Sequence, residues 1–108
     1  MTVESFQNRF GLRAVCMPSP DKRVSGAYVG DLLSWVMGRA EAENVWITIM
    51  SNANIIAVAT LADVSCVLLA EGVSLDADTV ALAAEKGVNI LSTELPAYEI
   101  AGRIYGNV

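Results

Sequence analysis

The feature that most constrains this fold is an alternation between short apolar or β-branched runs and helix-like segments of about ten residues. Strands are expected over residues 13–17, 24–29, 44–50, 65–70 and 88–93, and helices over residues 1–10, 31–40, 54–62, 75–87 and 95–106. Strands alternating with helices of this length indicate βαβ units. We therefore expect residues 1–108 to form a single α/β domain with three layers, in which helices cover both faces of a largely parallel sheet. The pattern does not determine the strand order.

Several helix ends carry local capping signals. Asp76 is a suitable N-cap, and Gly87 follows the last helical residue of the same segment. Gly11 stands where the C-terminal glycine of the first helix belongs. Asp63 interrupts two apolar runs and is expected to cap the turn from a helix into a strand.

Composition narrows the classes of partner. Apolar residues make up 54% of the chain and charged residues only 18%, which is more apolar than a soluble domain of this size needs. A self-association interface would explain the excess, so a homodimer is expected. The net charge of −5 and the scattered basic residues argue against a nucleic-acid partner.

Catalytic and metal-binding side chains are scarce. The chain has no histidine, and its two cysteines, Cys16 and Cys66, lie far apart in apolar runs. We interpret both as buried free thiols of a reducing compartment, and we expect no cofactor and no metal. No pair of carboxylates stands out for acid–base chemistry, so no catalytic residue is assigned.

Nothing in the sequence indicates export or membrane insertion. The N-terminus has no basic and then apolar signal segment, so a cytoplasmic location is expected. The most apolar stretch, residues 54–70, is interrupted by Asp63 and fits a helix followed by a buried strand better than a membrane span.

The segment from Gly26 to Asp31 raises the question of a phosphate loop, because it has two glycines between a strand and a helix. It does not match G-x-x-x-x-G-K-[ST], and Asp31 stands where the lysine would follow. A carboxylate repels phosphate and is a natural helix N-cap. A structural turn, with Asp31 as the N-cap of the next helix, is therefore favoured over an anion site.

In open α/β sheets, ligands bind beyond the C-terminal ends of the strands, which selects the loops 25–31, 51–54, 71–76 and 92–95. The candidate ligand or interface residues are Ser25, Gly26, Tyr28, Gly30, Asp31, Thr48, Asn52, Asn54, Ser92, Thr93 and Tyr98. Ser and Asn are also ordinary capping residues, so a structural role remains the alternative. Tyr28, Trp35, Trp46 and Tyr98 are interpreted either as an aromatic wall or, more simply, as core and dimer-seam residues.

Three stretches together resemble stand-alone DRTGG-domain proteins. They are GAYVGDLLSWVMGRA, VWITIMSNANIIAVATLADVSCVLLAEG and ILSTELPAYEIAGRIY, and the resemblance runs from about Gly11 to Tyr105. The family consists of small bacterial and archaeal α/β proteins, often described as related to the serine kinase of HPr. The resemblance implies a compact domain that tends to dimerise and that serves regulation or assembly beside nucleotide-sensing CBS modules. Stand-alone members are often encoded near iron-only hydrogenase genes, which implies a link to anaerobic redox metabolism.

The chain departs from the family pattern because it has no Asp-Arg-Thr-Gly-Gly stretch. The nearest equivalent is the segment from Tyr28 to Asp31, and the family defines no catalytic residues that could be carried over. Kinase activity is rejected, since the chain has neither a P-loop nor a histidine. The expected function is a non-catalytic regulatory or interaction domain acting as a homodimer. The alternative is a sensor that binds a nucleotide or small anion at the strand-end loops, and an enzyme using carboxylates is least favoured.

Overall fold

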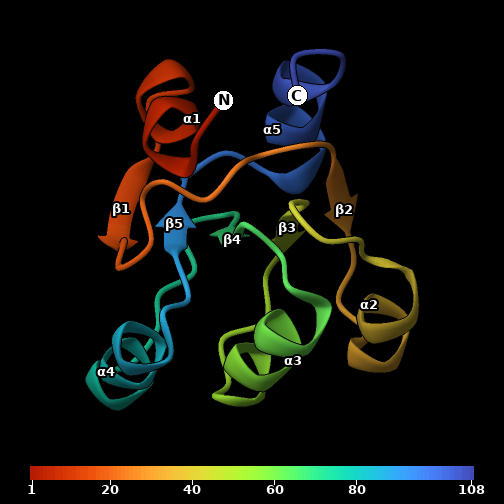
Figure 1. The fold of residues 1–108 in the computed structure, drawn as a ribbon. Coiled ribbons are helices and arrows are strands. Elements are labelled where there is room, and N and C mark those ends of the chain that lie inside the picture. Colours follow the sequence, from red (N-terminus) through yellow and green to blue (C-terminus); the bar gives the residue numbers. More distant parts are fainter.

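A five-stranded sheet forms the middle layer of the protein, and helices cover it on both sides (Figure 1). The computed structural model describes all of residues 1–108. The elements in chain order are α1 (Val3–Arg9), β1 (Arg13–Cys16), β2 (Ala27–Val29), α2 (Leu33–Arg39), β3 (Val45–Thr48), α3 (Asn54–Ala62), β4 (Cys66–Leu69), α4 (Ala77–Lys86), β5 (Ile90–Ser92) and α5 (Ala97–Ile104). The predicted three-layer α/β fold is confirmed, with strands shorter than the apolar runs suggested.

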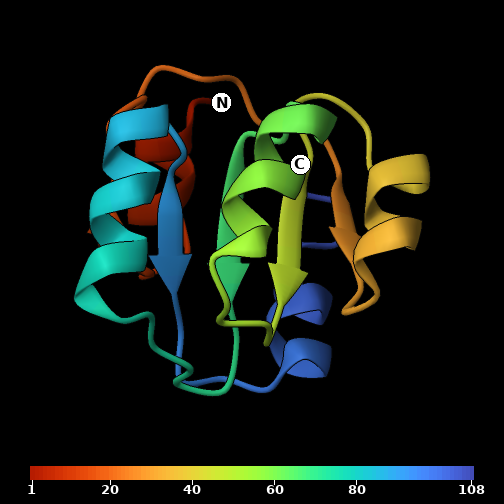
Figure 2. The same ribbon diagram turned by 90° about the horizontal axis from the view of Figure 1, so that it is seen from below.

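The strand order is β1-β5-β4-β3-β2. Strands β2 to β5 are parallel and follow one another across the sheet, while β1 pairs antiparallel with β5. The connecting helices α2, α3 and α4 all lie on one face, and α1 and α5 lie on the other (Figures 1 and 2). The order of the parallel strands never reverses, so the sheet lacks the switch point at which many open α/β sheets bind ligands.

The sheet divides the core in two because successive side chains of a strand point to opposite faces. In β3, Val45 and Ile47 pack with α1 and α5, whereas Trp46 packs with the three connecting helices. In β4, Leu68 and Leu69 divide in the same way. Every residue of β3 and β4 is buried, which explains why their sequences read as continuous apolar runs rather than alternating ones.

The local capping predictions are confirmed at four helix ends. Asp76 caps α4 by accepting a 2.7 Å hydrogen bond from the N–H of Thr79, and Gly87 ends that helix with φ of 74°. Gly11 follows α1 with φ of 63°, and Asp63 is the C-cap of α3 with φ of 55°. No helix of the protein is both long enough and apolar enough to cross a bilayer.

Candidate functional site

The C-terminal ends of β2, β3, β4 and β5 all lie along the same end of the sheet, which we call the strand-end edge, because the four strands are parallel. Ser25 and Gly26 precede β2 and therefore lie at the opposite edge, so their prediction as strand-end residues is wrong. They form a turn against Asn44, whose Nδ2 donates a 2.8 Å hydrogen bond to the carbonyl oxygen of Ser25. Gly26 has φ of 72°, and a Cβ there would lie 3.1 Å from the same Nδ2 atom.

Tyr28 and Gly30 form a packed unit at the C-terminal end of β2. Tyr28 packs against the core on the α2, α3 and α4 face. A Cβ on Gly30 would lie 2.8 Å from the Tyr28 ring, so only glycine leaves room for that ring. The Gly30 carbonyl oxygen accepts a 2.9 Å hydrogen bond from Nε1 of Trp46. This glycine therefore serves the packing of two aromatic side chains.

Asp31 does not cap α2, and the prediction that it does is wrong. The N-cap of α2 is Leu32, which makes no side-chain capping bond. Asp31 Oδ1 instead accepts hydrogen bonds from Oγ1 of Thr48 at 2.7 Å and from the backbone N–H of Ile49 at 3.1 Å. Two predicted site residues thus meet at the strand-end edge, but they bind each other and join the ends of β2 and β3.

Asn52 and Asn54 lie together at the start of α3. Oδ1 of Asn52 accepts a 2.9 Å hydrogen bond from the backbone N–H of Asn54, the first residue of the helix. This is the local turn expected of an asparagine two residues before a helix. The arrangement supports the structural interpretation of this loop.

The end of β5 is the part of the strand-end edge that is hollowed. Ser92 and Thr93 line a cleft of about 400 Å³, which we call the β5 cleft. Its other lining residues are Phe10, Gly11, Arg13, Glu94, Leu95 and Arg103. A second hollow of about 290 Å³ lies alongside, and the two share Arg13, Ser92 and Glu94.

The sequence did not point to Arg13 or Arg103 as site residues. Arg13 reaches the cleft because β1 pairs antiparallel with β5 in a register that places it opposite Ser92. Arg103 belongs to the last turn of α5. A pairing between segments so distant in the chain has no local sequence signal, so only the sheet topology reveals this cluster.

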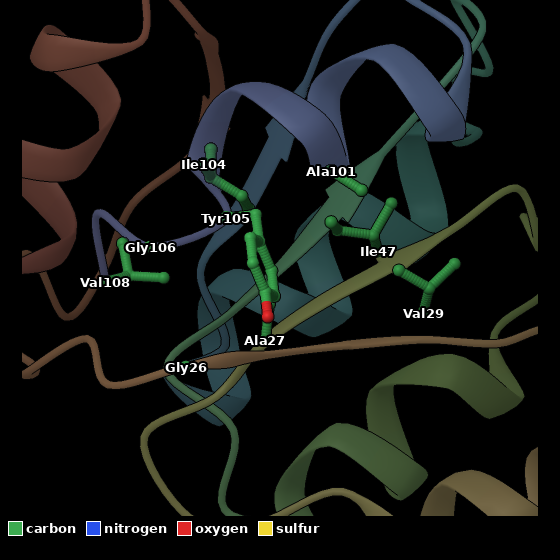
Figure 3. A pocket seen from close by; sticks show the side chains of 9 residues that line it. All are labelled: Gly26, Ala27, Val29, Ile47, Ala101, Ile104, Tyr105, Gly106 and Val108. Carbon is green, nitrogen blue, oxygen red and sulfur yellow. The ribbon is translucent and has the colours of Figure 1, made fainter.

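An apolar groove lies on the other side of α5, between that helix and β2 (Figure 3). Its volume is about 260 Å³, and its lining residues are Gly26, Ala27, Val29, Ile47, Ala101, Ile104, Tyr105, Gly106 and Val108. The groove exists because α5 packs over β3 and leaves β2, the edge strand, partly open. In Figure 3 the ring of Tyr105 extends across the groove toward Ala27.

Large exposed apolar side chains gather around β2 and α2. Eight such side chains are exposed in the protein, and five of them lie on β2, on or just before α2, or just after β3. The five are Val29, Leu32, Trp35, Met37 and Ile49, and we call them the α2–β2 surface. Val29 lines the groove on the α5 side of β2, whereas Trp35 and Met37 belong to α2 on the opposite face of the sheet (Figure 1). Only Val36 of the seven residues of α2 is buried, so most of this short helix faces solvent.

The predicted aromatic wall does not form. Trp46 is fully buried, whereas Tyr98 is 90% exposed on α5. Trp35 is 53% exposed, and the Arg39 guanidinium lies 4.0 Å from the centre of its ring. Trp46 is thus a core residue, and a dimer-seam role for the exposed Trp35 and Tyr98 stays a prediction.

Three titratable groups have shifted pKa values. Burial raises the pKa of the Cys66 thiol to about 12, against a smaller opposing effect of the Lys22 charge. Burial likewise raises the pKa of Cys16, and a hydrogen bond with the backbone opposes it. Hydrogen bonds from Thr79 lower the pKa of Asp76. None of the three groups lines the β5 cleft, the hollow beside it or the apolar groove. No cluster of Cys, Asp and Glu side chains has the geometry to hold a metal ion.

Comparison with known structures supports the fold. The chain is similar to the CBS and DRTGG domains of the regulatory region of Clostridium perfringens pyrophosphatase, solved in complex with the activator diadenosine tetraphosphate. The TM-score is 0.68 at 15% sequence identity, and the match covers 94% of this chain and 44% of the other. This chain thus spans less than half the length of that regulatory region.

Comparison of sequences gives the family. No curated protein sequence matches the chain. The DRTGG domain family matches residues 19–106, which is most of the length of this chain. The resemblance seen in the sequence is thereby confirmed, and the chain belongs to the DRTGG domain family.

Proposed function

We propose that this protein is a non-catalytic regulatory domain that acts as a homodimer. The observation that carries the proposal is the α2–β2 surface, because five of the eight large exposed apolar side chains lie on or beside the edge strand β2 and helix α2. Exposed apolar area of this kind marks an interaction site. The similar fold within the regulatory region of a pyrophosphatase supports a regulatory role.

The charge distribution favours a second copy of the chain as the partner. Between Val24 and Gly38 the only charged residue is Asp31, and its carboxylate is turned toward Thr48 and Ile49. The charge nearest to the exposed ring of Trp35 is the Arg39 guanidinium, so two copies with a net charge of −5 each would not bring carboxylates together at that ring. The other outer strand, β1, is less suited to pairing with a second copy. It begins with Arg13 and contains a bulge, and both features discourage one edge strand from pairing with another.

Sedimentation equilibrium at micromolar concentration tests the dimer. The expected mass is twice the 11.5 kDa of one chain. The variant Trp35→Glu should sediment as a monomer, because a carboxylate would be buried in the interface without a partner. Leu61→Glu is the matched control, since Leu61 is an apolar residue of α3 with 74% exposure outside the surface. A wild-type protein that stays monomeric at these concentrations would contradict the proposal.

A ligand-sensing role is the second candidate, and the β5 cleft favours it. The cleft combines two arginines with two hydroxyl side chains beyond the C-terminal end of β5. The similar structure is a complex with a nucleotide activator, so nucleotides are the first ligands to test. A ligand at about 100 times its dissociation constant should stabilise the protein by about 2.7 kcal/mol. Thermal unfolding with ADP, ATP and diadenosine tetraphosphate checks this, and the absence of any shift would exclude these nucleotides as ligands.

A further inference from the structure

Three of the seven basic residues of this acidic chain lie at or beside the β5 cleft. Arg13 and Arg103 line it, and the Arg9 guanidinium lies 5.4 Å from the centre of the Phe10 ring, which also lines it. Arg9 ends α1, Arg13 begins β1 and Arg103 lies in the last turn of α5. Asn107 links two of them, because its Oδ1 accepts a hydrogen bond from Nη2 of Arg9 at 3.0 Å and its Nδ2 donates one to the carbonyl oxygen of Arg103 at 3.2 Å. Helices α1 and α5 lie on the same face of the sheet (Figure 1), so both approach the end of β5 from one side.

The guanidinium groups facing the β5 cleft are not neutralised within the chain. Arg13 makes no ion pair and no side-chain hydrogen bond. Arg103 has only a 3.8 Å contact with Glu99, and both side chains of that pair are more than half exposed. An exposed pair of this length contributes little, so Arg103 can exchange it for another anion.

The remaining polar groups of the cleft can act as hydrogen-bond donors. The Ser92 hydroxyl has no hydrogen-bond partner in the chain, and Oγ1 of Thr93 accepts from the N–H of Leu95 at 3.2 Å, which leaves its own proton free. The one acid of the cleft is Glu94, whose carboxylate is turned over Gly72. That carboxylate lies beyond ion-pair distance from both arginines.

We propose that the β5 cleft binds the phosphate group of a small phosphorylated molecule between Arg13 and Arg103. Guanidinium groups match phosphate geometry through paired N–H donors, and Ser92 and Thr93 add hydroxyl donors from the end of β5. The volume of about 400 Å³ lies in the range of small-ligand sites. The adjoining hollow of about 290 Å³ shares Arg13 with the cleft and can hold the rest of a larger ligand.

This site rests on the second candidate function, ligand sensing. Two-dimensional ¹H–¹⁵N NMR tests separately whether a ligand binds and whether it binds in the β5 cleft. The probes are inorganic phosphate, ADP and ATP, each added in chloride buffer of constant ionic strength, with acetate as the carboxylate control. Saturable shifts are expected for the amides of residues 92–95 and for the Nε–H group of Arg13. Acetate should bind more weakly, because it offers fewer acceptor oxygens to the two arginines.

Substitutions identify the residues that hold the phosphate group. Arg13→Ala should weaken binding about tenfold or more, because it removes a charge-assisted pair of hydrogen bonds. Arg13→Lys should weaken it less, since the charge remains while the fork of donors is lost. Lys86→Ala is the control, because Lys86 is a basic residue at the end of α4, outside the cleft. Arg13 is exposed on an edge strand, so circular dichroism should show that all three variants are folded.

The NMR outcomes distinguish a failure of the β5 cleft as the binding site from a failure of the ligand-sensing role. Shifts that map to the groove beside β2 would show ligand binding but overturn the β5 cleft as its site. Binding that Arg13→Ala and Lys86→Ala weaken equally would overturn the role of Arg13. No saturable shift with any probe would contradict both the site and the sensor role for these ligands.

Discussion

Oγ1 of Thr48 donates a 2.7 Å hydrogen bond to Oδ1 of Asp31, and this bond holds the C-terminal ends of β2 and β3 together. The same carboxylate oxygen accepts the N–H of Ile49 at 3.1 Å. Thr48 is 2% exposed, so its hydroxyl proton has no access to bulk water as an alternative acceptor. The aspartate of the glycine-rich segment is therefore a structural residue that fixes the exit of β2.

We predict that Asp31→Ala lowers the free energy of unfolding by about 1–3 kcal/mol, because it leaves the buried Thr48 hydroxyl without an acceptor. Asp31→Asn should cost less, since the amide oxygen can still accept from both donors. Urea unfolding of the three proteins at neutral pH measures the difference. Equal stability of Asp31→Ala and the wild type would show that the bond contributes nothing to the fold.

Asn89 ties the turn after β1 to the sheet and is 1% exposed. Its Nδ2 donates to the carbonyl oxygens of Ser19 at 2.8 Å and Ser65 at 2.9 Å, and its Oδ1 accepts from the N–H of Ser19 at 2.9 Å. Asn89→Ala should destabilise the protein by about 2–4 kcal/mol, because one buried and two partly buried backbone groups lose their partner together. Ser19→Ala is the control, since it removes only the bond from its Oγ to the Gly87 carbonyl oxygen. A smaller loss for Asn89→Ala than for Ser19→Ala in urea unfolding would refute this account.

The two thiols should differ in reactivity. Cys66 is fully buried with its pKa raised to about 12, so it carries almost no thiolate at pH 8. Cys16 is only partly buried, at the edge strand β1, although burial raises its pKa too. We predict that Ellman's reagent modifies at most one thiol per native chain at pH 8 and two in guanidinium chloride. The variant Cys16→Ala should show no native reactivity, and a rapidly reacting thiol in that variant would contradict the burial of Cys66.

Capping was predictable from the sequence because its signals are local. Asp76, Gly87, Gly11 and Asp63 each act on backbone groups within a few residues, so their positions in the chain were sufficient. The α/β class was predictable for a similar reason, since strand and helix periodicities repeat along the chain. Asp31 misled because a carboxylate before a helix suggests an N-cap, whereas its actual partner lies 17 residues away across the sheet.

The candidate sites depended on contacts that the sequence does not encode locally. Ser25 and Gly26 lie at the wrong end of the sheet for ligand binding, because β2 begins at Ala27, three residues later than the expected strand, and both residues precede it. Arg13 comes to Ser92 through antiparallel pairing of β1 with the last strand, which no periodicity indicates. The groove beside β2 exists only because α5 returns over β3 rather than over the edge strand. Strand order, rather than composition, thus determines which side chains form each hollow.

The N-cap of α4 should make stability depend on pH in the acidic range. Hydrogen bonds from Thr79 hold the pKa of Asp76 below its ordinary value, so the folded state binds the proton more weakly than the unfolded state. The contribution of this cap is therefore complete above about pH 4 and is lost as the pH falls through the lower, folded-state pKa. Asp76→Asn should keep most of the capping bond at neutral pH but remove this part of the acid dependence, whereas Asp76→Ala should lose the cap at every pH. Urea unfolding at several pH values between 2 and 7 measures both effects, and an identical acid dependence in Asp76→Asn and the wild type would show that other carboxylates account for it.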